Sequence, residues 1–315
     1  MKRAALLLAL ALFWACPAPR VEPDAGSTSG VPPEERFGND AELLADFANL
    51  KVCTYRKGRL DHACPQVKTL KLRLETKART PSRRKKMITT LANLLESKKE
   101  VSRLMAAGSL YPVRKESVIA SALDGALLRE KVPAVKAVML RQLCWTPGPR
   151  TEKVALALLG GANPAAVRVQ AARCLGRLTR LSAPGQKALL AALAGEDPRV
   201  AGAACAVAGK HRVAAAVPRL AALLGRRDLG WRCAPALAAV GGKAAYAALL
   251  QAMASGAGKA RVPAPLISAL ASFRGEDYFE REKVAPLLKR IAANKSMSKL
   301  ARLRAGAELE VLKKK

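Results

Sequence analysis

The sequence is poor in aromatic residues and in histidine. Phe, Trp and Tyr make up 4% of its 315 residues, and only two histidines are present. β-Sandwiches and β-barrels depend on aromatic and β-branched residues, so this composition argues against both. The sequence also has no GxGxxG, GxxxxGK[ST], HExxH, CxxC or GxSxG motif. We therefore expect a protein that is not an enzyme and that needs no cofactor and no metal.

Acidic residues are also scarce. The chain has 24 Asp and Glu against 55 Lys and Arg, which gives a net charge of +31. Between residues 51 and 115, 18 bases stand against four acids. A strong positive field attracts anionic partners, but the same bases also keep an Ala-rich surface soluble, and the composition leaves both explanations open.

The densest group of bases lies in residues 68–86, KTLKLRLETKARTPSRRKK. We expect a helix to begin within this segment, where positive charge is unfavourable because of the helix dipole. Its candidate anion-binding residues are Arg83, Arg84, Lys85 and Lys86. Such a patch could hold phosphates of lipid headgroups, lipopolysaccharide or nucleic acid, or it could be a solvated linker.

The longest apolar run near the N-terminus covers only twelve residues, from Ala4 to Ala15. It follows Lys2 and Arg3, and it is shorter than the roughly 20 residues that a bilayer-spanning helix needs. A charged start, a short apolar run and a final small residue are typical of a signal peptide.

Cys16 directly follows Ala15, and these first residues resemble a bacterial lipoprotein precursor. The resemblance implies removal of residues 1–15, lipidation of Cys16 and, because Pro17 follows, residence in the outer membrane facing the periplasm. Soluble export and an uncleaved anchor are the alternatives. Residues 17–36 are rich in Pro, Gly, Ser and acid, so we expect residues 16–40 to form a disordered tether.

Cys53 and Cys64 lie in the segment CTYRKGRLDHAC, which predicts a hairpin. A turn at Gly58-Arg59 would place Arg56 opposite Asp61 and Cys53 opposite Cys64, within the range of a disulfide. A metal site at the two cysteines and His62 would have only three ligands, without typical spacing. We therefore expect a structural disulfide here.

The four remaining cysteines lie in Ala-rich segments at spacings of 30, 31 and 28 residues; they are Cys144, Cys174, Cys205 and Cys233. Neighbouring helices usually lie 8–10 Å apart, which is too far for most disulfides. We expect these cysteines to be buried thiols.

The strongest pattern is a repeat of short amphipathic helices from about residue 83 onward. Residues 163–178, 197–211 and 228–242 each begin with Asn or Asp and end near a glycine, at Gly176, Gly209 and Gly241. Apolar helices with Leu at intervals of three or four lie between them. Two helices per unit and a period near 30 indicate an α-solenoid, in which stacking buries the apolar faces.

The repeat resembles HEAT repeats, specifically the short phycobilisome-lyase-like class. The resemblance covers about 131–256 and rests on Asp197, Pro198, Val200, Ala203, Ala204, Gly209, Val217, Pro218, Leu220, Leu223 and Leu224. It implies an all-α superhelix of helical hairpins over 83–315, preceded at 41–82 by an N-terminal cap.

These expectations favour a non-catalytic protein-binding scaffold of the bacterial cell envelope, anchored through its N-terminal lipid. The partner would be a protein recognised by a curved basic surface. The alternative is a binder of anionic surfaces, such as lipid or polysaccharide. Nucleic acid is not the natural partner that an envelope location favours.

Overall fold

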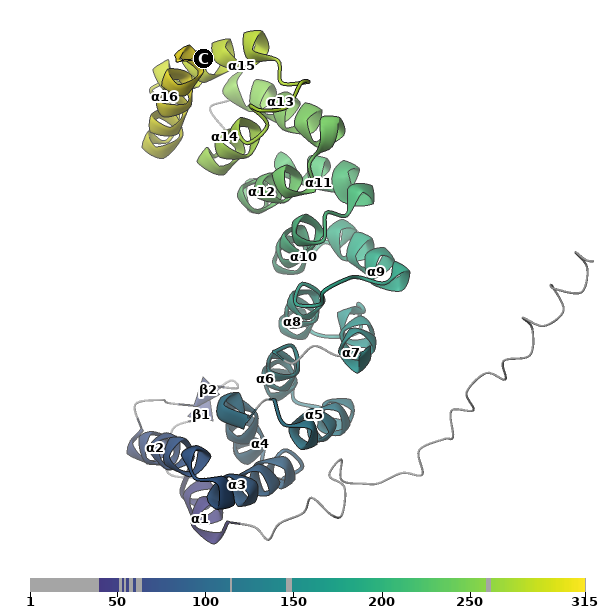
Figure 1. Cartoon of the computed structure of the whole chain (residues 1–315), viewed down its shortest axis with the longest axis vertical. Coiled ribbons are helices and arrows are strands. Elements are labelled where there is room, and N and C mark those ends of the chain that lie inside the picture. The colour runs from purple at the N-terminus through teal and green to yellow at the C-terminus, as the bar shows by residue number, and fades with distance from the viewer. Residues whose placement is uncertain are drawn as a thin grey trace, which may run out of the picture.

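A computed structural model of the protein describes residues 40–50, 53, 55–56, 59–60, 64–113, 115–145, 149–258 and 262–314. The described chain is all-helical apart from one two-stranded hairpin (Figure 1). The predicted signal peptide, Cys16, the tether up to residue 39, His62 and the turn residue Gly58 lie outside the described residues. None of the described helices is both long and apolar enough to cross a bilayer.

The N-terminal elements form a compact end of the molecule. They are α1 (Ala41–Asn49), β1 (Tyr55–Arg56), β2 (Arg59–Leu60), α2 (Pro65–Arg79), α3 (Pro81–Leu94), α4 (Glu100–Gly108) and the short 3-10 helix η3 (Tyr111–Val113). Helix α2 packs against α3, and α1 packs against both. The segment that begins at Val67 is helical, because it lies within α2.

The remaining helices alternate between two rows. They are α5 (Ser117–Arg129), α6 (Pro133–Leu143), α7 (Pro149–Leu159), α8 (Ala165–Leu175), α9 (Ala183–Ala194), α10 (Pro198–Lys210), α11 (Val217–Leu224), α12 (Gly230–Val240), α13 (Gly242–Gly258), α14 (Ala264–Ala271), α15 (Arg281–Ala293) and α16 (Lys299–Lys313). A 3-10 helix, η4 (Ala214–Ala216), precedes α11.

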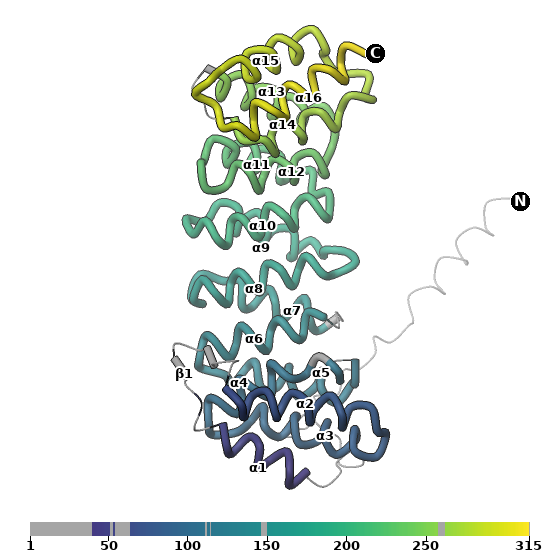
Figure 2. The backbone as a smooth tube through the Cα atoms, turned by 90° about the vertical axis from the view of Figure 1, so that its left-hand side faces the viewer, coloured from purple at the N-terminus to yellow at the C-terminus, as the bar shows by residue number. Residues whose placement is uncertain are grey.

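Each helix of a row contacts the next helix of the same row. Helix α8 packs against α6 and α10, and α12 packs against α10 and α14, while α9 packs against α7 and α11. Figure 2 shows α6, α8, α10 and α12 stacked one above the next. The whole array is curved, with α6, α8, α10, α12 and α14 on the inner side of the curve, and we call these five helices the inner row (Figure 1). Helices α7, α9, α11 and α13 form the outer row.

Helix starts follow the expected chemistry at some positions and depart from it at others. The Asp197 side chain accepts hydrogen bonds from the backbone N–H groups of Arg199 and Val200 and caps α10. Asp228, by contrast, lies before Leu229, the N-cap of α12, and pairs with Arg226 instead. The expected cap at Asp228 is therefore wrong, because the chain makes one more turn before the helix begins.

Small residues let the inner-row helices approach closely. A Cβ atom added at Gly209 would lie 2.8 Å from the Cα atom of Ala236, on the next helix of the row. The sequence suggested that Gly209 ends a helix, but Gly209 lies inside α10. Its role there is the close contact with Ala236. Gly241 does end α12, with a positive φ of 78° that favours glycine.

The helical cysteines form disulfides, which corrects the expectation of buried thiols. Cys144 is bonded to Cys174, with Cα atoms 5.0 Å apart, and Cys205 is bonded to Cys233, with Cα atoms 5.1 Å apart. The expectation failed because it assumed ordinary interaxial distances, whereas the Cα atoms of each bonded pair lie within the range of a disulfide. Each bond joins one inner-row helix to the next, and all four cysteines are buried.

Cys53 and Cys64 also form a disulfide, with Cα atoms 5.8 Å apart. The hairpin register differs from the predicted one, because Tyr55 pairs with Leu60 and Arg56 with Arg59. The strands therefore turn one residue earlier than predicted, and the disulfide lies outside the short ladder. Cys64 is already the N-cap of α2, which takes it out of the strand register.

Candidate functional site

The predicted anion-binding residues lie in the first turns of α3, but they do not act as one set. The Arg84 guanidinium is half-buried and pairs with Glu116 at 2.7 Å, and it also donates to the backbone carbonyls of Ala78 and Pro112. Arg83, Lys85 and Lys86 are exposed. Arg84 thus ties α3 to the start of α5, which is a structural task.

Arg84 also borders a cavity of about 480 Å³ between α2 and the end of α4. Its lining combines the cations Lys71, Arg79 and Arg84 with the acid Glu75 over an apolar floor. The negative ends of the α4 backbone dipoles, at Gly108 and Ser109, also face this space. The mixed charge makes it a weaker anion site than its three cations suggest.

Many acids of the molecule are used to link one helical pair to the next. Glu130 is buried and accepts a hydrogen bond from Arg103 at 2.6 Å, and Glu308 forms an ion pair with Arg274 at 3.0 Å. Burial by itself would raise the pKa of the Glu130 carboxyl, but the bonds from Arg103 and from backbone N–H groups lower it below the ordinary value. These carboxylates are structural and are not available as acid–base pairs.

The inner row, in contrast, contains no carboxylate at all within its helices. Its charged residues are Lys136, Arg141, Arg168, Arg173, Arg199, Lys210 and Arg232. Because each inner-row helix is covered by its row neighbours and by the outer row, its exposed residues face outward from the inner side of the curve. The inner surface is therefore lined by cations and small side chains, without acids from these helices.

Several polar side chains on the inner row reach back to the end of the preceding helix. The Lys210 ammonium donates to the backbone carbonyl of Gly176, and His211 Nε2 lies 3.0 Å from the carbonyl oxygen of Leu175. Since the last carbonyls of a helix lack partners within the helix, these contacts cap α8 from the next repeat. His211 is itself the C-cap residue of α10.

Trp145 and Trp231 are both partly exposed, at 41% and 47%. The guanidinium carbon of Arg177 lies 3.5 Å from the centre of the Trp145 ring, and that of Arg232 lies 4.5 Å from the Trp231 ring. Trp231 follows the N-cap of α12 and lies on the surface. The sequence could have indicated the contact between Trp145 and Arg177, because Trp145 lies one repeat before Arg177.

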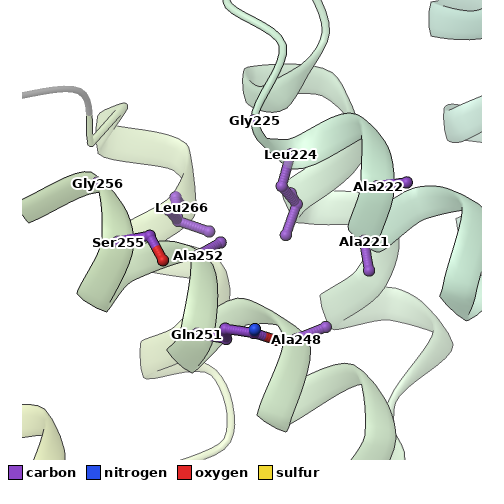
Figure 3. A pocket seen from close by; sticks show the side chains of 10 residues that line it. All are labelled: Ala221, Ala222, Leu224, Gly225, Ala248, Gln251, Ala252, Ser255, Gly256 and Leu266. Atoms are coloured by element: carbon purple, nitrogen blue, oxygen red, sulfur yellow. The ribbon is translucent and has the colours of Figure 1, made fainter. Parts of the chain in front are cut away.

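An apolar groove of about 500 Å³ lies between α11 and α13 on the outer row (Figure 3). It is lined mostly by Ala, Gly and Leu residues, and Gln251 and Ser255 are its polar side chains. The groove contains no titratable group, so it offers no acid, base or metal ligand.

The loop 272–280 is an internal connection. Tyr246 of α13 packs against Phe273, Tyr278 and Phe279 at ring-centre distances of 5.7 to 5.9 Å. The Tyr246 hydroxyl accepts a hydrogen bond from the backbone N–H of Glu280. Burial raises the pKa of this hydroxyl, so Tyr246 stays neutral and holds the loop in place.

Asp124 has a partly buried carboxylate, which the sequence did not indicate. One of its carboxylate oxygens is buried without a hydrogen bond, and burial raises the pKa of the carboxyl against the opposing field of Arg150. It lies on α5 in the outer part of the array. Over the residues that the structure describes, no group of three His, Cys, Asp or Glu side chains could hold a metal ion.

Comparison with known proteins adds no relative to this description. The sequence matches no protein-family model and no curated protein.

Proposed function

We propose that the protein is a non-catalytic scaffold that binds an acidic protein partner along the inner side of its curved helical array. The array is a solenoid of HEAT-like helical hairpins in this proposal, with the inner row as its binding surface. Repetition of similar pairs with contacts only to neighbours is the arrangement that gives such solenoids an extended concave surface.

The observation that carries the proposal is the charge of the inner row. Four successive helices, α6, α8, α10 and α12, carry Lys and Arg but no Asp or Glu, and α14 carries no charged residue. Among the outer-row helices, α7 carries one acid, Glu152, while α9, α11 and α13 also lack Asp and Glu. The inner-row helices carry seven Lys and Arg residues without an acid, against five with one acid in the outer row, and this excess of uncompensated cations is what an acidic partner on the inner side would use.

The cysteines support an export route. Six of the seven cysteines form disulfides, which persist in oxidising compartments. The remaining one is Cys16, the residue that the lipoprotein resemblance assigns to lipidation. We propose a lipid anchor at Cys16 and an envelope location, in the outer membrane facing the periplasm.

The anchor is tested by membrane fractionation of the Cys16→Ser variant. We expect the wild-type chain to sediment with membranes and the variant to be released or retained unprocessed. Equal membrane association and equal processing of the two proteins would contradict a lipid at Cys16.

The binding surface is tested by photo-crosslinking in cells. A photoreactive residue at Gln170 or Ala206, on the inner row, is compared with one at Lys187, on the outer row. We expect one protein to be captured from the inner positions only, and to survive high-salt washing. The same products from both rows, or lipid products alone, would contradict the proposal and favour a general anion-surface binder.

A further inference from the structure

We propose that Arg141, Trp145, Arg173 and Arg177 together form the anchoring site for an acidic polypeptide segment of the partner. This inference rests on the proposed function and names the part of the inner row that contributes most to binding. We call these four residues the Arg–Trp cluster.

The positions of these residues in the repeat bring them together. Arg141 precedes Trp145 by four residues at the end of α6, and Arg173 precedes Arg177 by four residues at the end of α8. Residues four apart lie on the same side of a helix about 5–6 Å from each other. Since α6 and α8 are neighbours in the inner row, the two pairs form a four-membered patch.

A disulfide fixes the distance between the two pairs. Cys144, next to Trp145, is bonded to Cys174, next to Arg173, and both cysteines are buried beneath the surface. The contact between Arg177 and the Trp145 ring spans the same two helix ends. The cluster is therefore held by a covalent bond below and by a cation–π contact above, which reduces the cost of ordering it on binding.

The three guanidiniums are available to a ligand. All three are exposed, and among the residues that the structure describes none of them forms an ion pair with a carboxylate. Elsewhere in the molecule arginines such as Arg103 and Arg274 pair with acids of a neighbouring helix. The arginines of the cluster have no such internal task.

The chemistry of the cluster fits a carboxylate-bearing chain. Guanidinium groups pair with carboxylates through two parallel hydrogen bonds, and an exposed indole offers an apolar face to the stems of the same side chains. Trp and Arg are also the residues that most often dominate the energy of protein interfaces. A planar membrane fits less well, because helices α6 and α8, at whose ends the cluster is built, lie on the inner side of the curve (Figure 1).

The test measures binding of a fluorescently labelled oligo-glutamate peptide to the full chain. The triple variant R141Q/R173Q/R177Q removes the three charges of the cluster. Its matched control, K187Q/R219Q/K243Q, removes three exposed charges from the outer row. We expect the cluster variant to bind about tenfold more weakly, since exposed ion pairs contribute modestly but add up. The control should change affinity by about twofold at most, because its charges act only through the screened long-range field.

A second readout uses the fluorescence of Trp145 in a background that carries both Trp14→Phe and Trp231→Phe. Peptide binding should change the emission of Trp145 as its contact with Arg177 is altered, and the cluster variant should lose this response. A structural effect of the substitutions would appear instead as a lower melting temperature. No change of Trp145 emission at saturating peptide would overturn the inference.

A third variant, R199Q/R232Q, separates this inference from the proposed function. If it weakens peptide binding while the cluster variant does not, the inner row binds acidic chains and the anchor assignment is wrong. Equal losses in the cluster variant and its outer-row control would overturn both proposals. Binding to phosphatidylglycerol vesicles without binding to the peptide would also overturn both.

Discussion

The N-terminal helices and the middle of the chain hold their neighbouring elements together in different ways. At the N-terminal end, Asp40 and Lys77 form a buried ion pair at 2.6 Å that joins α1 to α2. In the middle, disulfides join α6 to α8 and α10 to α12, and the contact of Gly209 with Ala236 adds to the second pair. The first kind of link depends on charge and the second on shape, so the two regions should respond to different changes.

The buried pair shows how the first kind works. Asp40 caps α1 through the backbone N–H of Leu43, and its own N–H donates to the Thr90 hydroxyl of α3. Burial would raise the pKa of its carboxyl, but the bonds from Lys77 and Leu43 lower it below the ordinary value. Burial would lower the pKa of Lys77, but Asp40 and Glu42 raise it. One residue, Asp40, thus connects three helices through its carboxylate and its backbone N–H.

The largest effect is expected from breaking a disulfide in the middle region. The double variant C144A/C174A opens a loop of 30 residues, and we expect the free energy of unfolding to fall by about 3–4 kcal/mol. Thermal unfolding of variant and wild type without reductant measures this loss. A reductant should lower the stability of the wild type more than that of the variant. The difference in stability between the two proteins should therefore become smaller. Equal stability without reductant would show that the bond adds nothing to the packing.

Removing Lys77 should cost slightly less. In Lys77→Met the Asp40 carboxylate is left buried without its cation, so we expect a loss of about 3 kcal/mol. The control is Lys68→Met on the same helix, where the lysine is exposed. Chemical denaturation of both variants checks the difference. Similar midpoints for the two variants would mean that the buried pair contributes no more than a surface lysine.

The close contacts of the inner row predict an intermediate effect. In Gly209→Ala the new methyl group meets the backbone of Ala236, and we expect a loss of about 1–3 kcal/mol. The same substitution at Gly306 of α16 meets nothing within 4 Å, and it should stabilise the helix by about 0.5–1 kcal/mol. Differential scanning calorimetry of the pair tests the sign as well as the size. Two shifts of the same sign would contradict the close approach of α10 and α12.

The smallest effect is a pH dependence that separates the two kinds of link. Because the folded-state pKa values of Asp40 and Glu130 are lowered, their stabilisation is present above pH 4 and decreases as pH falls through the lowered values. The cost of Lys77→Met should therefore be smaller at pH 3 than at pH 7. The cost of Gly209→Ala should not change, since no titrating group is involved. Melting temperatures at the two pH values test this, and parallel changes would contradict it.

The sequence predicted the helices well because their spacing of Leu and Ala is regular. The predicted and observed segments agree at α10 and α11, where Asp197 and Pro198 begin one helix and Pro218 lies in the first turn of the other. It could not predict the disulfides of the inner row, because these depend on how closely two helices approach. The sequence also could not predict the hairpin register, since moving the turn by one residue leaves the local sequence pattern unchanged.

The candidate surface was predicted only in its general character. The net charge indicated a basic protein, but the densest run, at Arg83 to Lys86, includes the structural residue Arg84. The arginines of the Arg–Trp cluster are scattered along the sequence at one or two per helix. They form a patch only because the repeat period places Arg141 and Arg173 on adjacent helices. A density of charge along the chain is therefore a poor guide to a density of charge on a surface of stacked helices.

The order of the disulfides has a consequence for how the protein is made. Every bonded cysteine pairs with its nearest sequence neighbour among the six, as Cys53–Cys64, Cys144–Cys174 and Cys205–Cys233. If the chain crosses a membrane N-terminus first into an oxidising compartment, each cysteine meets its correct partner before any later cysteine has emerged. Simple oxidation in order of arrival then gives the native set, with no wrong bond that an isomerase would have to repair.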